Sequence, residues 1–166
     1  NEKYKVLATK GNLNNHIGVP LTLLNITKDH EIAIIEMGAN HQNEIALLCS
    51  IAEPNYGMIT NIGKAHLEGF GGAEGVIKAK NELYQFIKQR SGKLFVNADN
   101  ELLKKLSEEI DRITFGTSED SDFAGIFVES NPFVKLRCKA KTDVESLDEK
   151  PIINTQLLGK YNFENI

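Results

Sequence analysis

The chain has 166 residues, of which 41% are hydrophobic and 25% are charged, a composition typical of a single soluble globular domain. Its 19 basic and 23 acidic residues give a formal net charge of −4 without a basic cluster, which argues against nucleic acid as a partner. No apolar run approaches the roughly 20 residues that span a bilayer, so membrane insertion is not expected. Cys49 and Cys138 match no metal-ligand spacing, which favours free thiols in the reducing cytoplasm.

Short apolar runs alternate with helical patterns along the first two thirds of the chain. The second and third runs are apolar almost throughout, as in parallel strands that helices cover on both faces. Between the runs, apolar residues recur every three or four positions, which indicates helices packed on one side. The sequence therefore predicts an α/β fold with a mostly parallel sheet flanked by helices. The expected strands are 5–8, 31–37, 56–60, 93–96 and 112–115, and the expected helices are 18–27, 43–52, 73–89 and 101–110.

The pattern changes after Thr117. Three strand-like runs, 122–130, 133–141 and 151–159, follow one another without a helix between them, which predicts a small antiparallel β appendage at the C-terminal end. We therefore expect a parallel α/β part over 1–117 and, over 118–166, the appendage and the start of a following helix. The chain opens at Asn1 and stops inside that helical pattern, so both ends are expected to be cuts in a longer protein.

Polar or glycine residues follow each expected strand of the first part. Ligands of open parallel sheets bind beyond the carboxyl ends of the strands, so these segments are candidates as a group. Glu36 closes the most apolar run, where an unpaired carboxylate is costly unless it caps a helix, pairs with a cation or holds a metal. His66 follows the third run by a few residues and is interpreted either as a structural histidine or as a metal ligand.

Lys80 lies on an apolar helical stripe with Val76, Leu83, Tyr84 and Ile87. One interpretation is that its stem covers the core while the ammonium returns to water. The other is a desolvated lysine whose pKa is lowered toward neutrality, so that the amine can react or meet an anion.

Four segments, 12–24, 36–45, 60–83 and 157–166, together resemble, in the same order, the central ATP-binding domain of the Mur ligases of bacterial peptidoglycan synthesis. The phrases "EMGAN" and "AHLEGFG" are similar to the branch that adds D-alanyl-D-alanine to a UDP-N-acetylmuramoyl-tripeptide. The resemblance implies a P-loop-type domain that lies between an N-terminal domain for the UDP-sugar and a C-terminal domain that closes over the nucleotide. Neither flanking domain is expected in this chain.

The resemblance also implies the chemistry and the roles of three residues. ATP phosphorylates the substrate carboxylate, and the incoming amine then displaces phosphate, while Mg²⁺ neutralises the negative charge that accumulates. Glu36 would hold the magnesium between the β- and γ-phosphates, and His66 would help to hold a second one. Lys80 matches a lysine that adds carbon dioxide in several members, and the resulting carbamate is an oxygen ligand for a metal.

Further residues follow from the same resemblance. Asn162 and Asn165 match asparagines that reach the nucleotide base, and Asn15 lies in the loop that faces the UDP-sugar-peptide. The sequence departs from the family at Tyr161, where histidine is usual, and at Asn43, where glycine is frequent. It also contains no G-x-x-x-x-G-K-[ST] phosphate loop, which the family carries just upstream of the matching region.

The resulting prediction is a fragment of an ATP-dependent amide ligase that uses UDP-N-acetylmuramoyl-tripeptide and D-alanyl-D-alanine as substrates and is inactive by itself. Two alternatives remain open. One is a sister ligase, either another Mur enzyme or a folylpolyglutamate synthetase, because the residues above serve the shared ATP step. The other is a non-catalytic α/β interaction module without a phosphate loop.

Overall fold

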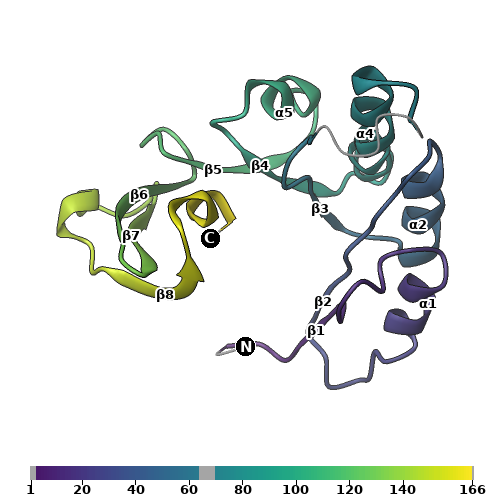
Figure 1. Ribbon diagram of the computed structural model, residues 1–166, viewed down its shortest axis with the longest axis horizontal. Coiled ribbons are helices and arrows are strands. Elements are labelled where there is room, and N and C mark those ends of the chain that lie inside the picture. The colour runs from purple at the N-terminus through teal and green to yellow at the C-terminus, as the bar shows by residue number, and fades with distance from the viewer. Residues whose placement is uncertain (1–2, 64–69, 166) are drawn as a thin grey trace. The chain divides into compact units, whose positions relative to one another are not determined.

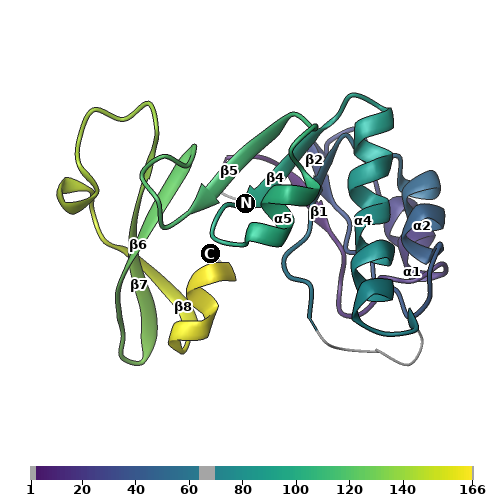
Figure 2. The same cartoon turned by 90° about the horizontal axis from the view of Figure 1, so that it is seen from above.

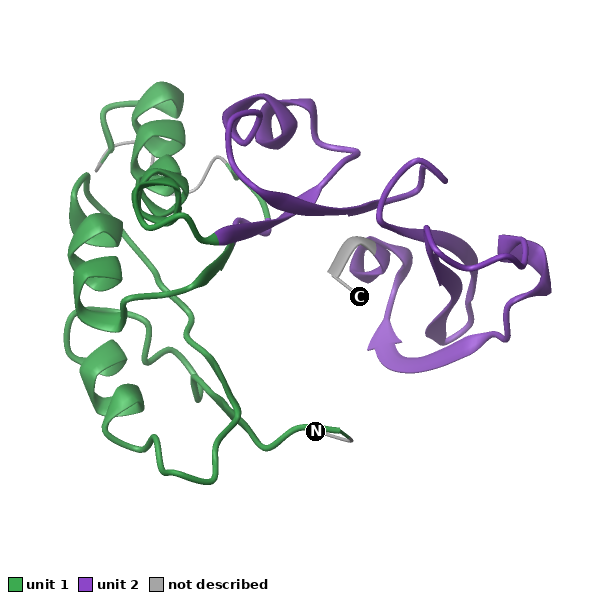
Figure 3. Cartoon of the chain, turned by 180° about the vertical axis from the view of Figure 1, so that it is seen from behind, with its two compact units in different colours: residues 1–57, 61–92 green, residues 58–60, 93–166 purple. Residues whose placement is uncertain are grey.

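The computed structural model describes residues 3–63 and 70–165 (Figure 1). The chain forms two compact units, one of residues 1–57 and 61–92 and the other of residues 58–60 and 93–166 (Figure 3). None of the helices in the described ranges combines the length and the apolarity that crossing a bilayer requires.

The first unit alternates strands and helices, as the sequence predicts. Strand β1 pairs in parallel with β2, with Val6 opposite Ile32 and Ala8 opposite Ile34. Helices α2 and α4 run side by side in this unit (Figure 2). Its elements are β1 (Val6–Ala8), α1 (Gly18–Leu23), β2 (Ile32–Ile34), α2 (Glu44–Ala52), the start of β3 (Tyr56–Met58) and α4 (Ala73–Gln89).

The core of this unit lies between its helices and one face of the β2 segment. Four fully or almost fully buried residues form its centre: Val19, Ile45, Leu48 and Cys49. Ile35 and Met37 pack against this cluster, whereas Ile32 and Ile34 are 41% and 59% exposed. Because side chains alternate along an extended segment, only one set of residues in this run meets the helices. The expectation of cover on both faces is therefore wrong for β2 in this chain.

The second unit contains most of a mixed sheet. Strand β4 pairs in parallel with β5, and β5 pairs in parallel with β6 through Phe115 opposite Phe123 and Gly116 opposite Ala124. The pairs β6–β7 and β7–β8 are antiparallel. Its elements are β4 (Lys93–Asn97), α5 (Glu101–Leu106), β5 (Arg112–Gly116), β6 (Phe123–Ser130), β7 (Phe133–Ala140), the 3-10 helix η1 (Leu147–Glu149), β8 (Ile153–Leu158) and the 3-10 helix η2 (Lys160–Asn165).

The α/β class with mostly parallel pairing in the first part is confirmed, with two differences in the sheets. Within the described residues, β1 and β2 form a sheet of their own, and the six-stranded sheet has the order β3-β4-β5-β6-β7-β8, so the five expected parallel strands do not share one sheet. The antiparallel strands continue this second sheet instead of forming a separate layer, because β6 adds to the edge of β5 before the chain reverses. The division into 1–117 and 118–166 stays a prediction. The two compact units divide the chain at another place, between Gly92 and Lys93.

Helix α5 ends earlier than its apolar spacing predicts. Ser107 donates its hydroxyl proton to the carbonyls of Leu103 and Lys104 at 2.8 and 3.0 Å, and Arg112 Nη1 donates to the Lys104 carbonyl at 2.9 Å. Side chains therefore satisfy the carbonyls that a further helical turn would have used. Ile110 is still buried, although it lies beyond the helix.

Candidate functional site

Glu36 follows β2 and is exposed, held by residues from the loop after β1. Asn14 Nδ2 donates to Glu36 Oε1 at 2.7 Å, and the Glu36 backbone N–H donates to Thr9 Oγ1 at 2.9 Å. Gly38 N–H donates to the Asn14 carbonyl at 2.8 Å, which joins the two loops through their backbones. Within the described residues Glu36 Oε2 accepts no hydrogen bond. Glu36 is therefore an oriented carboxylate with one oxygen available to a hard cation such as Mg²⁺.

Asn15 lies three residues before Gly18, the first residue of α1. Its Oδ1 accepts the backbone N–H groups of Ile17 and Gly18 at 3.1 and 2.9 Å, two donors that lack partners inside α1. A Cβ at Gly18 would lie 2.3 Å from the backbone of Leu13, so only glycine allows the helix to start this close to the loop. Asn15 thus has a local structural role, and its contact with a substrate stays a prediction.

Lys80 is partly buried on α4. Its Nζ donates to the carbonyl of Asn61, in the segment after β3, at 2.6 Å. Burial lowers the pKa of the Lys80 ammonium, because desolvation penalises the charged form. A lowered pKa increases the fraction of neutral amine, which is the form that reacts with carbon dioxide. The partial burial and the contact with Asn61 are compatible with the carbamate interpretation, which stays a prediction.

The loops after β2 and β3 meet the same part of α4. Phe70, Val76 and Ala79 form a buried cluster, and Ala39 and Ile62 pack against it. Ala39 lies three residues after Glu36, Ile62 is adjacent to Asn61, and Ala79 precedes Lys80. The packing therefore brings the loop that carries Glu36 against α4, the helix that carries Lys80.

His66 lies outside the described residues. We predict that its side chain and those of Glu36 and Lys80 converge within about 10 Å, two strand spacings, at the carboxyl edge of the strands. Within the ranges that the structure describes, no three His, Cys, Asp or Glu residues gather in a group that could hold a metal.

The residues matched to nucleotide binding lie in η2. Asn162 Nδ2 donates to the Leu158 carbonyl at 2.8 Å, so this side chain also stabilises the turn from β8 into η2. The exposed Tyr161 stands beside it, and the side chain of Asn165 lies outside the described part of the chain. The nucleotide contacts of Asn162 and Asn165 stay predictions.

Sequence reasoning did not single out three supporting residues: Thr9, Asn14 and Glu82. Glu82, on α4, accepts the backbone N–H groups of Asn43 and Ala46 at the start of α2. Asn14 could have been suspected, because it lies in the polar segment that follows the first apolar run. Nothing in the sequence marks Glu82, because its partners lie 39 and 36 residues away.

The Mur ligase middle domain family matches residues 1–166. The chain is 50% identical over 162 residues to the UDP-N-acetylmuramoyl-tripeptide–D-alanyl-D-alanine ligase of Haemophilus influenzae, covering 96% of this chain and 34% of that protein. Its fold is similar to that of MurF from Acinetobacter baumannii, with a TM-score of 0.82, 29% identity and coverage of 99% of this chain and 35% of that one. A MurF ligase from Thermotoga maritima in complex with ADP matches with a TM-score of 0.73 at 29% identity, over 92% of this chain and 34% of that one.

The chain belongs to the Mur ligase middle domain family. It spans about a third of the length of the relatives that it matches. Within the family, the relative named above by its reaction and the two named as MurF indicate the D-alanyl-D-alanine-adding branch.

Proposed function

We propose that this chain is the central nucleotide-binding domain of a UDP-N-acetylmuramoyl-tripeptide–D-alanyl-D-alanine ligase of peptidoglycan synthesis. The observation that carries the proposal is 50% identity, over nearly the whole chain, to a protein of that name. The complete enzyme would be a cytoplasmic ligase that uses ATP, and the ADP complex of the Thermotoga maritima relative supports nucleotide binding.

In this proposal the residues of the chain act mainly by binding and orienting. Mg²⁺, when bound with ATP, neutralises charge on the phosphates and on the acyl phosphate. Glu36 offers Oε2 to the cation while Asn14 fixes Oε1. Lys80 would first lose its proton and add carbon dioxide, which turns a cation into an anionic oxygen ligand. His66 would complete the second metal site.

The other proposed contacts use atoms that the fold leaves available. Asn15 Oδ1 accepts the backbone N–H groups of Ile17 and Gly18, so a contact with the UDP-sugar-peptide would come from its Nδ2. Asn162 and Asn165 would reach the base of the nucleotide. D-alanyl-D-alanine would enter as the amine that displaces phosphate from the activated carboxylate.

The test is product formation by the complete enzyme with ATP, Mg²⁺, the UDP-linked tripeptide and D-alanyl-D-alanine. We expect an amide product with this dipeptide and none with the single amino acids that sister Mur ligases or folylpolyglutamate synthetase add. Product with a single amino acid instead would favour the sister-ligase alternative. A parent gene without a phosphate loop upstream, together with no nucleotide binding, would favour the non-catalytic module.

Lys80 provides a second test of the same proposal. Lys80→Ala in the complete enzyme should lose activity by a factor on the order of 100 or more, and a small added carboxylate should restore part of it. Lys80→Arg should be equally inactive, because arginine keeps the charge but forms no carbamate. Lys78→Ala, an exposed lysine on the same helix, is the matched control. Full activity in Lys80→Arg would show that only a positive charge is needed.

A further inference from the structure

We propose that Glu82 is a positioning residue for the metal site: from the helix that carries Lys80, it fixes the start of α2 and, through it, the loop that carries Glu36. This inference rests on the proposed function. Glu82 would touch neither substrate nor cation, and its effect would pass through the loop of residues 36–43.

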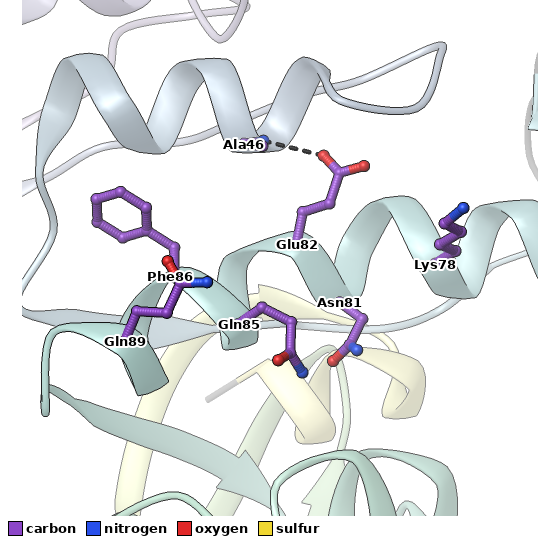
Figure 4. A pocket seen from close by; sticks show the side chains of 7 residues that line it. All are labelled: Ala46, Lys78, Asn81, Glu82, Gln85, Phe86 and Gln89. Carbon is purple, nitrogen blue, oxygen red and sulfur yellow. Dashed lines mark hydrogen bonds between the residues drawn. The ribbon is translucent and has the colours of Figure 1, made fainter.

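The first observation is a bidentate contact between the two helices. Glu82 Oε1 accepts the backbone N–H of Asn43 at 2.7 Å, and Oε2 accepts that of Ala46 at 2.9 Å. Figure 4 shows Glu82 on α4 extending toward Ala46 on α2, and both residues line the same pocket. Asn43 occupies the N-cap position of α2, and Ala46 is the third residue of the helix. One carboxylate from another helix therefore satisfies the two N–H groups that a capping box would normally satisfy from within.

The second observation is that the N-cap residue of α2 provides no side-chain capping bond. Asn43 has a left-handed backbone with φ of 69° and makes no side-chain capping bond. The helix start therefore relies on Glu82, whose negative charge is also favoured at the positive end of the helix dipole. Asparagine is among the few residues other than glycine that tolerate this φ.

The third observation is that several backbone N–H groups of the loop between Glu36 and α2 are hydrogen-bonded. Glu44 Oε2 accepts the N–H groups of Asn40 and His41 at 2.7 and 3.1 Å. Gly38 N–H is bound by the carbonyl of Asn14, which also holds Glu36 through its side chain. A short hydrogen-bonded segment thus links Asn43 to Glu36, so a shift of Asn43 would also shift the carboxylate of Glu36.

The fourth observation is the orientation of α4. Lys80 and Glu82 are two residues apart, so they lie on different sides of the helix. Lys80 donates to the segment after β3, whereas Glu82 accepts from the start of α2. Helix α4 therefore contacts both the segment after β3 and the start of α2. In this proposal the contact of Glu82 sets the distance between the loop that carries Glu36 and Lys80 on α4.

The test compares Glu82→Gln and Glu82→Ala with the wild-type complete enzyme, and Glu74→Gln is the control. Glutamine keeps one acceptor oxygen but turns a donor toward the second N–H, so alanine should have the larger effect. Glu74 is an exposed acid in the first turn of the same helix and controls for the lost charge.

Two measurements decide the outcome. Hydrogen exchange without metal should be faster by roughly 10-fold at the amides of Asn43 and Ala46 in Glu82→Gln, with residues 101–106 unchanged. The Mg²⁺ concentration for half-maximal velocity should rise roughly 10-fold, whereas the KM for D-alanyl-D-alanine and the velocity at saturating Mg²⁺ should stay within about twofold of wild type. Glu74→Gln should behave as wild type in both.

The proposal is overturned if exchange and Mg²⁺ dependence in both Glu82 variants match the wild type. It is also overturned if exchange rises equally in all segments, because Glu82 would then only stabilise the fold. A wild-type enzyme that makes no dipeptide product refutes the proposed function instead, and the exchange experiment still decides whether Glu82 positions the loop.

Discussion

Asn14 holds Glu36 from a loop 22 residues earlier in the chain, through a bond of 2.7 Å. The neighbouring glycine is part of the same arrangement, since a Cβ at Gly38 would lie 2.9 Å from the side chain of Asn14. The side-chain amide of Asn14 therefore orients the Glu36 carboxylate, and it has room to do so because Gly38 has no side chain. At this scale, Asn14 sets the direction in which the Glu36 carboxylate points.

We expect Asn14→Ala to raise the Mg²⁺ concentration for half-maximal velocity of the complete enzyme by roughly 10-fold, because residues that orient a metal ligand typically contribute that much to metal affinity. The free energy of unfolding should fall by only about 1 kcal/mol. Initial rates over a Mg²⁺ titration and a denaturant titration measure the two effects. Asn12→Ala, an exposed neighbour, should leave both at wild-type values. An unchanged Mg²⁺ dependence in Asn14→Ala would contradict this role.

Burial, and then the charge of Glu82, raises the pKa of the Cys49 thiol to about 11. The exposed Cys138 has no such cover. At pH 8 a thiol reagent should therefore modify one cysteine per 166-residue chain quickly, and Cys138→Ser should abolish this reaction. Because the folded pKa is raised, the contribution of Cys49 to stability is complete below the unfolded pKa of about 9 and is lost as pH rises toward 11. Rapid labelling of two thiols in the folded chain would argue against the buried position of Cys49.

At the scale of elements, Asp122 joins β5 to the turn before β6. Its Oδ2 accepts the backbone N–H and the hydroxyl of Thr114 at 2.7 and 2.8 Å, and its own N–H donates to Thr114 Oγ1 at 3.0 Å. These bonds fix the point where the sheet passes from parallel to antiparallel pairing. The Thr114 N–H, followed by its hydroxyl, lowers the pKa of the Asp122 carboxyl.

Asp122→Ala should reduce the free energy of unfolding of the chain at pH 7 by about 1–2 kcal/mol, since two hydrogen bonds to a charged acceptor are lost. A lowered folded pKa stabilises the chain above the unfolded pKa of about 4, and this contribution disappears as pH falls below it. The difference between variant and wild type should therefore shrink in acid. Denaturant titrations at pH 7 and pH 3 measure it, with the exposed Asp120→Ala as control. A difference that stays constant between the two pH values would exclude the charged form as its cause.

At the scale of the whole molecule, the chain covers about a third of its relatives. Its 166 residues contain no phosphate-loop motif, so the backbone N–H groups and the lysine that hold the β- and γ-phosphates in such loops are not supplied by this chain. The exposed Ile32 and Ile34 also show an apolar face of β2 that these residues leave uncovered.

We therefore expect the purified 166-residue chain to form no amide product from ATP, Mg²⁺, the UDP-linked tripeptide and D-alanyl-D-alanine. Product analysis by mass spectrometry, with the complete enzyme as positive control, tests this. Turnover that stays with the chain through purification would show that the phosphate loop and the flanking domains are dispensable.

The α/β class, the bounds of the helix Ala73–Gln89 and the family could all be predicted from the sequence, because apolar periodicity and ordered motifs are local properties. For Lys80 the sequence left two interpretations open, a charge returned to water and a desolvated amine. The folded structure was needed to show that Asn15 binds the first N–H of α1, that Ile34 lies exposed, and that β6 continues the sheet beside β5. It alone joined Asn14 to Glu36 and Glu82 to the start of α2. These contacts join residues dozens of positions apart, and no local pattern encodes which distant donor a carboxylate meets once the chain has folded.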